Sequence, residues 1–177
     1  MAATKLGRTN QYLTFRLGPE TYALDVGNAR EIVEVSEVTK IPRTPPWIRG
    51  VINLRGTVVP VLDLKLKFDM GVTEKTVNTV VIIVELLLAG DPFVIGVLAD
   101  AAQEVFELEA KHIEPPPKFG ARVDTQYMRG LARRGDAIYI ILDIERVFSG
   151  GDMSMAQQVS ESLEAQTVQE LDVARQA

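Results

Sequence analysis

The chain has 177 residues, enough for one large domain or two small barrels, because a core becomes self-supporting above roughly 60 residues. Its formal net charge is −5, and residues 152–175 hold five acidic residues against one arginine, so the rest of the chain is almost neutral. A near-neutral body argues against nucleic-acid binding, which needs a clustered excess of basic residues. The chain has no cysteine and no apolar run close to the ~20 residues of a membrane-spanning helix, so we expect a soluble, cytoplasmic protein.

Alternation of apolar and polar residues with period two predicts β-hairpins along most of the chain. The first hairpin spans 13–26 with its turn at 18–20, and the second spans 51–62 around Arg55-Gly56. A third spans 77–98 around 90–92, and a further strand at 137–142 follows the turn Gly135-Asp136. Short strands with turns at this spacing are typical of small barrels or sandwiches.

Helical patterns are few. Residues 44–48 predict a short helical turn at most, and residues 143–148 predict another turn and a half. Residues 153–175 contain good helix formers with a thin apolar stripe. This pattern favours a weakly packed surface helix or tail, and a partner-binding helix is the alternative.

The sequence resembles itself in three ordered blocks. Residues 28–35 match 101–108, residues 47–50 match 127–130, and residues 61–64 match 141–144. The alternative is chance similarity between two β-rich halves, but the matching glycine, charged and apolar positions favour two copies of one small barrel.

The repeat pairs Ala29 with Ala102 and Ile32 with Val105. If each pair lies on one side of its strand or turn, these small and branched residues form a shallow apolar trough between the copies, suited to a partner's helix. The alternative, that these residues plug the two barrels, is equally compatible with the sequence.

Residues with catalytic potential form no convincing set, so we expect no enzyme activity, cofactor or metal. The single histidine, His112, has no cysteine or second histidine to complete a zinc site. Asp63 and Asp143 recur at strand ends, where an aspartate more often caps the following turn than acts as an acid or base. Arg55, at a glycine-supported turn, suits a bidentate contact to a partner's carboxylate, and the alternative is a solvated turn residue.

The run Ile48-Arg49-Gly50-Val51-Ile52-Asn53-Leu54-Arg55-Gly56-Thr57-Val58-Val59-Pro60-Val61-Leu62-Asp63-Leu64 resembles the CheW family of chemotaxis coupling proteins. Similar stretches lie at 12–17, 22–26, 31–32, 97–100, 127–130 and 140–144, so the resemblance covers about residues 10–148. It implies a mainly β fold of two intertwined SH3-like five-stranded barrels. The CheW-like domain would span 10–150, with barrels near 10–75 and 76–148 that exchange strands, followed by an acidic helix or tail at 151–177.

The resemblance also implies a function. A CheW-like protein is a non-enzymatic scaffold that couples chemoreceptors to the regulatory domain of the histidine kinase CheA, and it reaches membrane receptor arrays through these partners. The alternative is an adaptor of a receptor–kinase pathway outside chemotaxis. The implied receptor-binding groove comprises Leu13, Val26, Ala29, Glu31, Ile32, Arg55, Ala102 and Val105. The implied kinase-binding residues are Val38, Ile41, Arg49 and Gly50.

Overall fold

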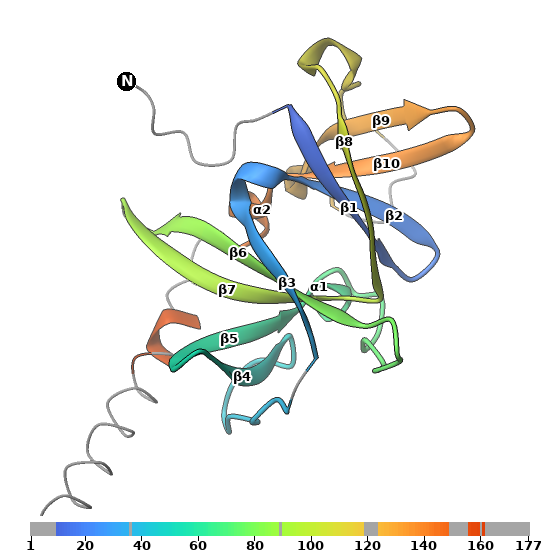
Figure 1. Ribbon diagram of the computed structural model, residues 1–177. Coiled ribbons are helices and arrows are strands. Elements are labelled where there is room, and N and C mark those ends of the chain that lie inside the picture. The colour runs from blue at the N-terminus through green and yellow to red at the C-terminus, as the bar shows by residue number, and fades with distance from the viewer. Residues whose placement is uncertain are drawn as a thin grey trace, which may run out of the picture.

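The computed structural model describes residues 10–35, 37–88, 90–118, 124–148, 156–159 and 161. The mainly β prediction is confirmed, because these residues form two five-stranded sheets (Figure 1). In hydrogen-bonded order, the first sheet contains β8 (Ala101–Glu107), β1 (Gln11–Leu17), β2 (Glu20–Asp25), β10 (Ala137–Leu142) and β9 (Met128–Arg134). The second contains β3 (Ala29–Glu34), β6 (Val80–Leu88), β7 (Asp91–Ala99), β5 (Thr57–Asp63) and β4 (Ile48–Leu54). Both sheets fit the SH3-like description, although neither strand order closes on itself within the described part of the chain.

Four antiparallel hairpins supply most of the strands, namely β1–β2, β4–β5, β6–β7 and β9–β10. Their turns are those expected from the glycine-containing sequences, so local turn chemistry determines these pairings. Among the described residues up to 148, the helices are single turns: α1 (Leu64–Lys67), α2 (Ile144–Val147) and the 3₁₀ turns Val26–Asn28, Ala110–His112 and Thr125–Tyr127. Residues 44–48 form a turn in which the amide of Ile48 donates to the carbonyl of Pro45 at 3.0 Å.

The predicted helix at 153–175 lies mostly outside the described residues. Residues 156–159 and 161 are helical, and Ala156 and Val159 are buried. Among the described residues, no helix has both the length and the apolar character needed to cross a membrane.

Each sheet takes strands from both sequence repeats. The hairpin β1–β2 of the first repeat joins β8, β9 and β10 of the second, while the hairpin β6–β7 of the second repeat joins β3, β4 and β5 of the first. The junctions are equivalent, because β2 pairs with β10 in parallel and β5 pairs with β7 in parallel. The two repeats therefore exchange their first hairpins reciprocally.

Three apolar clusters follow from the alternation of side chains along these strands. On β6, Val81 and Ile83 lie in the cluster of the second sheet, whereas Ile82 and Val84 lie in the cluster between the sheets. The cluster between the sheets contains twenty buried residues, against six in each of the others. Because burial of one large apolar side chain contributes about 1.5–3 kcal/mol, the interface between the sheets is the main source of stability.

Candidate partner-binding surfaces

The repeat found in the sequence has a three-dimensional counterpart at two glycines. Gly50 on β4 and Gly130 on β9 are buried, and a Cβ at either position would lie about 2.1–2.2 Å from a backbone carbonyl oxygen, of Thr39 and Glu114 respectively. Each glycine thereby lets a neighbouring segment approach closely enough to form a β-bridge with the residue that follows the glycine. Thr39 forms this bridge with Val51, and Glu114 forms it with Leu131. The two sites are structurally equivalent.

Asp63 and Asp143 also occupy equivalent places. Each caps the short helix that follows it: Asp63 accepts from the amides of Lys65 and Leu66, and Asp143 accepts from the amide of Arg146. This confirms the capping role expected for both aspartates. Their surroundings differ, since the Asp63 side chain is completely buried whereas that of Asp143 is 28% exposed.

The strands β3 and β8 are edge strands of the two sheets, and each presents one large apolar residue to solvent. Ile32 on β3 is 42% exposed, and Val105 on β8 is 54% exposed. These two residues are paired by the repeat, and in Figure 1 both strands run on the side of the molecule that faces the viewer. A single exposed apolar residue is ordinary, but its recurrence at the same place in both repeats makes this pair a candidate contact surface.

The other apolar residues of the expected receptor-binding groove are less accessible. Leu13 is only 6% exposed, lies in the cluster between the sheets and pairs with Val105 in register. Val26 and Ala29 are half-buried against the same cluster, and Ala102 is half-buried opposite Phe15. They support the surface on which Ile32 and Val105 project and offer little area of their own.

Glu31 and Arg55 form a bidentate ion pair that ties β3 to the turn between β4 and β5. Arg55 Nη1 donates to Glu31 Oε1 at 3.1 Å, and Arg55 Nη2 donates to Glu31 Oε2. Arg55 has a positive φ of 52° and its side chain is 69% exposed, as expected for the tip of a tight turn. The sequence indicated an exposed arginine but not its partner. The two residues are 24 positions apart and come together only when the second sheet has folded.

This ion pair shifts the pKa values of both side chains. The hydrogen bond from Arg55 lowers the pKa of Glu31 below its ordinary value, and the same contact raises the pKa of Arg55. With Arg30, the pair borders a hollow of about 480 Å³ whose apolar lining includes Leu54 and Ile83. A partner approaching this surface meets a preformed ion pair.

Two of the expected kinase-binding residues have structural contacts. Arg49 Nη1 donates to Asp63 Oδ2 at 2.9 Å and to the carbonyl of Thr73 at 3.1 Å. Thr73 in turn donates to Asp63 from its hydroxyl at 2.7 Å and from its amide at 3.0 Å. Arg49 therefore holds the 68–79 connection against β4, as Gly50 holds Thr39. Val38 and Ile41 are half-buried and present the remaining surface.

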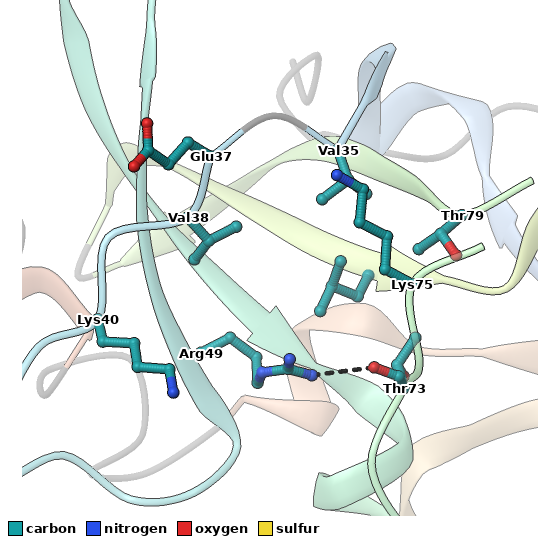
Figure 2. Close-up of a pocket in the computed structure, with 9 residues that line it drawn as sticks. Val35, Glu37, Val38, Lys40, Arg49, Thr73, Lys75 and Thr79 are labelled. Atoms are coloured by element: carbon teal, nitrogen blue, oxygen red, sulfur yellow. Dashed lines mark hydrogen bonds between the residues drawn. The ribbon is translucent and has the colours of Figure 1, made fainter. Parts of the chain in front are cut away.

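A second hollow, of about 270 Å³, lies beside this network (Figure 2). Its apolar lining is Val35, Val38 and Leu98, and cationic and hydroxyl side chains surround it. Thr73, Lys75 and Thr79 were not predicted as lining residues. The stretch 71–76 carries no motif, and Thr79 was expected within a strand that in the structure begins at Val80. The complete lining is Val35, Glu37, Val38, Lys40, Arg49, Thr73, Lys75, Thr79 and Leu98.

Potential metal ligands do not gather in the described part of the chain, where no three histidine or acidic side chains are placed to share an ion. The surfaces described above consist of apolar residues, ion pairs and hydroxyls.

Comparisons with known proteins identify relatives of this chain. The family model of the CheW-like domain matches residues 11–151. The chain is similar to the chemotaxis protein CheW of Klebsiella aerogenes, with 36% identity over 152 residues that cover 86% of this chain and 89% of the relative. It is also similar to the chemotaxis protein CheW of Treponema pallidum, with 27% identity over 81% of this chain and 84% of the relative. The crystal structure of the scaffolding protein TtCheW from Thermoanaerobacter tengcongensis superposes with a TM-score of 0.72 at 36% identity, covering 84% of this chain and 94% of that one.

Proposed function

Because this chain belongs to the CheW-like domain family, a family of chemotaxis scaffold proteins and not of enzymes, we propose that it couples chemoreceptors to a histidine kinase. In this proposal, one surface binds the helical cytoplasmic tip of a receptor and another binds the regulatory domain of the kinase CheA. The protein is recruited to receptor arrays at the membrane through these partners. Receptor state then controls the kinase through a chain of contacts and no reaction on the adaptor itself.

The observation that carries the receptor contact is the exposure of Ile32 and Val105 on two edge strands related by the repeat. A receptor helix that lies across both strands would bury both side chains, and amphipathic helices dock on protein surfaces through such apolar contacts. Glu31 and Arg55 are proposed as polar contacts at the edge of β3, where their ion pair fixes the geometry of both side chains. Glu31 pairs with Ile83 and Ile32 with Ile82, so the ion pair lies on the face of β3 opposite Ile32, and a receptor helix would have to wrap around this edge strand to reach both.

The kinase contact is proposed for the surface formed by Val38 and Ile41. Arg49 and Gly50 support this surface from below, since Arg49 is held by Asp63 and Gly50 packs on Thr39. The receptor and kinase surfaces are built from different segments, so the two partners can bind the protein together.

Titration of the purified protein with a receptor-tip fragment and with a kinase regulatory-domain fragment tests this proposal. We expect Ile32→Glu and Val105→Glu each to weaken receptor binding at least tenfold, because a charge would have to be buried in an apolar contact. Kinase binding should remain within twofold of the unmodified protein.

Ile138→Glu is the matched control, because Ile138 is 51% exposed on β10 and takes no part in either proposed surface. It should leave both affinities unchanged. Equal loss in the control, or binding of neither fragment by the unmodified protein, would contradict the proposal.

A second candidate is an adaptor of a receptor–kinase pathway outside chemotaxis. It remains open because the similarity extends to protein FrzA of Myxococcus xanthus, with 29% identity over 70% of this chain and 74% of the relative. Deletion of the gene distinguishes the two, since loss of chemotaxis in a swarm assay is expected only from the first.

A further inference from the structure

The hollow beside the Arg49–Asp63 network combines an apolar floor with a cationic border. Val35, Val38 and Leu98 form the floor. Lys40 and Lys75 stand at opposite sides of the hollow (Figure 2). Figure 2 shows the Glu37 carboxylate pointing away from the side formed by Arg49, Thr73 and Lys75. An occupant that matches this pattern has one apolar side chain with negative charges on both sides of it.

The chain carries such a segment in its own acidic tail. Leu171 is preceded by Glu170 and followed by Asp172, and it is the one apolar residue between 152 and 177 with a carboxylate on both sides. In an extended segment, the two carboxylates lie about 3.4 Å along the chain to either side of the leucine and point to the opposite face, towards the rim of the hollow. The long, flexible lysine side chains at the border can reach both of them.

We propose that residues 170–173 of the tail dock in this hollow of their own chain, with Leu171 on the apolar floor and the carboxylates of Glu170 and Asp172 beside Lys40 and Lys75. The length of the tail permits this. Glu161 is the last described residue, and the nine residues from there to 170 span up to about 30 Å when extended. That length is about the diameter of a small domain.

If the kinase binds as proposed above, a docked tail would compete with it. Val38 and Arg49 belong both to the hollow and to the kinase-binding surface, so a docked tail and the kinase compete. A short tether gives an effective concentration in the millimolar range, so a contact with a millimolar dissociation constant is about half occupied. Removal of residues 162–177 is then expected to raise the affinity for the kinase fragment about twofold.

The docking itself is tested without any partner, by paramagnetic relaxation in the full-length chain. Because the chain has no cysteine, Val173→Cys provides a single attachment point for a nitroxide. We expect strong broadening of the methyl signals of Val35, Val38 and Leu98, whereas those of Val105 and Ile138 on the first sheet remain sharp.

Charge reversal makes the test specific. Asp172→Lys or Lys75→Glu should each reduce the broadening at least threefold, and the two together should restore it. Lys111→Glu, at an exposed lysine that pairs with Glu109 outside the hollow, should leave it unchanged. Equal broadening on both sheets, or broadening that survives both charge reversals, would overturn the proposal. A mixed sample, in which isotope-enriched chains carry no nitroxide and unenriched chains carry it, gives a third test. Broadening in that sample would mean that a second copy supplies the tail, and it would also overturn the proposal.

Discussion

Asp63 is the buried acid on which three segments of the second sheet converge. Its carboxylate accepts from Arg49 on β4, from the hydroxyl and amide of Thr73, and from the first amides of α1. No side-chain oxygen or nitrogen buried in the described residues lacks a hydrogen-bond partner. The network is thus fully satisfied, which is the condition under which a buried ion pair stabilises a fold.

We therefore predict that Asp63→Asn lowers the free energy of unfolding by about 2–3 kcal/mol. The substitution leaves Arg49 without its counter-ion and sets an amide group against donors, and the loss stays below that of a fully buried pair because the Arg49 side chain is 33% exposed. Urea unfolding, followed by the fluorescence of the single tryptophan, measures the change.

Asp143→Asn is the matched control for this prediction. The pseudo-equivalent aspartate caps α2 and is partly exposed, and its one ion pair among the described residues is with the exposed Arg146 at 3.5 Å. Such an exposed pair contributes little, and asparagine caps helices about as well as aspartate. The control should change stability by less than about 0.5 kcal/mol. A similar loss in both variants would mean that capping, and not the buried network, accounts for the role of Asp63.

The Glu31–Arg55 pair makes a prediction about pH. The folded pKa of Glu31 is lowered, chiefly by the hydrogen bond from Arg55, so the pair contributes its stability above the unfolded value near 4.5. That contribution is lost as the pH falls through the lowered folded value. In a carboxyl-carbon NMR titration, Glu31 should titrate below an ordinary glutamate, and Arg55→Ala should move its midpoint upwards. An unchanged midpoint in the variant would show that the pair does not form in solution.

At the scale of elements, β4 and β9 each accept a bridging segment only because a glycine leaves room for it. Gly130→Ala would place a methyl group 2.2 Å from the carbonyl oxygen of Glu114, which is backbone and cannot rotate away. We expect a loss of about 2–3 kcal/mol in the free energy of unfolding, measured in urea.

Gly135→Ala serves as the control, because a Cβ there meets nothing within 4 Å and only the positive φ of 60° opposes it. Its cost should be about 1 kcal/mol. If both variants lose the same amount, the close approach of the 114 segment to β9 does not exist in solution.

Much of the local structure could be predicted from the sequence. The glycine-containing turns at 18–20, 55–56 and 90–92 predicted three hairpins, because two-strand pairing is encoded within about twenty residues, and the turn at 135–136 predicted the strand that follows it. The strand before the last turn, β9, was not predicted. Its sequence Met128–Arg134 has small and charged residues in place of a clear alternation, and it is held by β10 and by the bridge to Glu114.

The candidate surfaces were harder to predict than the hairpins. The repeat identified Ile32 and Val105 as equivalent, but not that Leu13 lies in the core, because strand alternation alone does not say which of two apolar faces is covered. The partner of Arg55 and the walls contributed by Thr73 and Lys75 come from distant segments. Such contacts follow from strand order, which a single sequence does not encode locally.

At the scale of the whole molecule, the reciprocal exchange of hairpins makes each repeat incomplete by itself. Residues 1–75 contain β1 to β5, and residues 76–177 contain β6 to β10. The first half would keep the hairpins β1–β2 and β4–β5 but lose the partners of both, and β3 would have no neighbour, since it pairs with β6. An isolated two-stranded hairpin is marginally stable at best.

We therefore predict that fragments 1–75 and 76–177 are unfolded alone and fold when mixed. Trp47 reports the association, because its ring lies 6.5 Å from that of Phe148 and the two residues belong to different fragments. Mixing should restore the far-UV circular dichroism of the intact chain and its tryptophan emission, with a dependence on fragment concentration. A second fragment carrying Ile82→Asp should not complement, because Ile82 is fully buried between the sheets. If either fragment alone gave a cooperative unfolding transition, its strands would form a complete sheet without the other repeat, and the exchanged arrangement could not be what holds the molecule together.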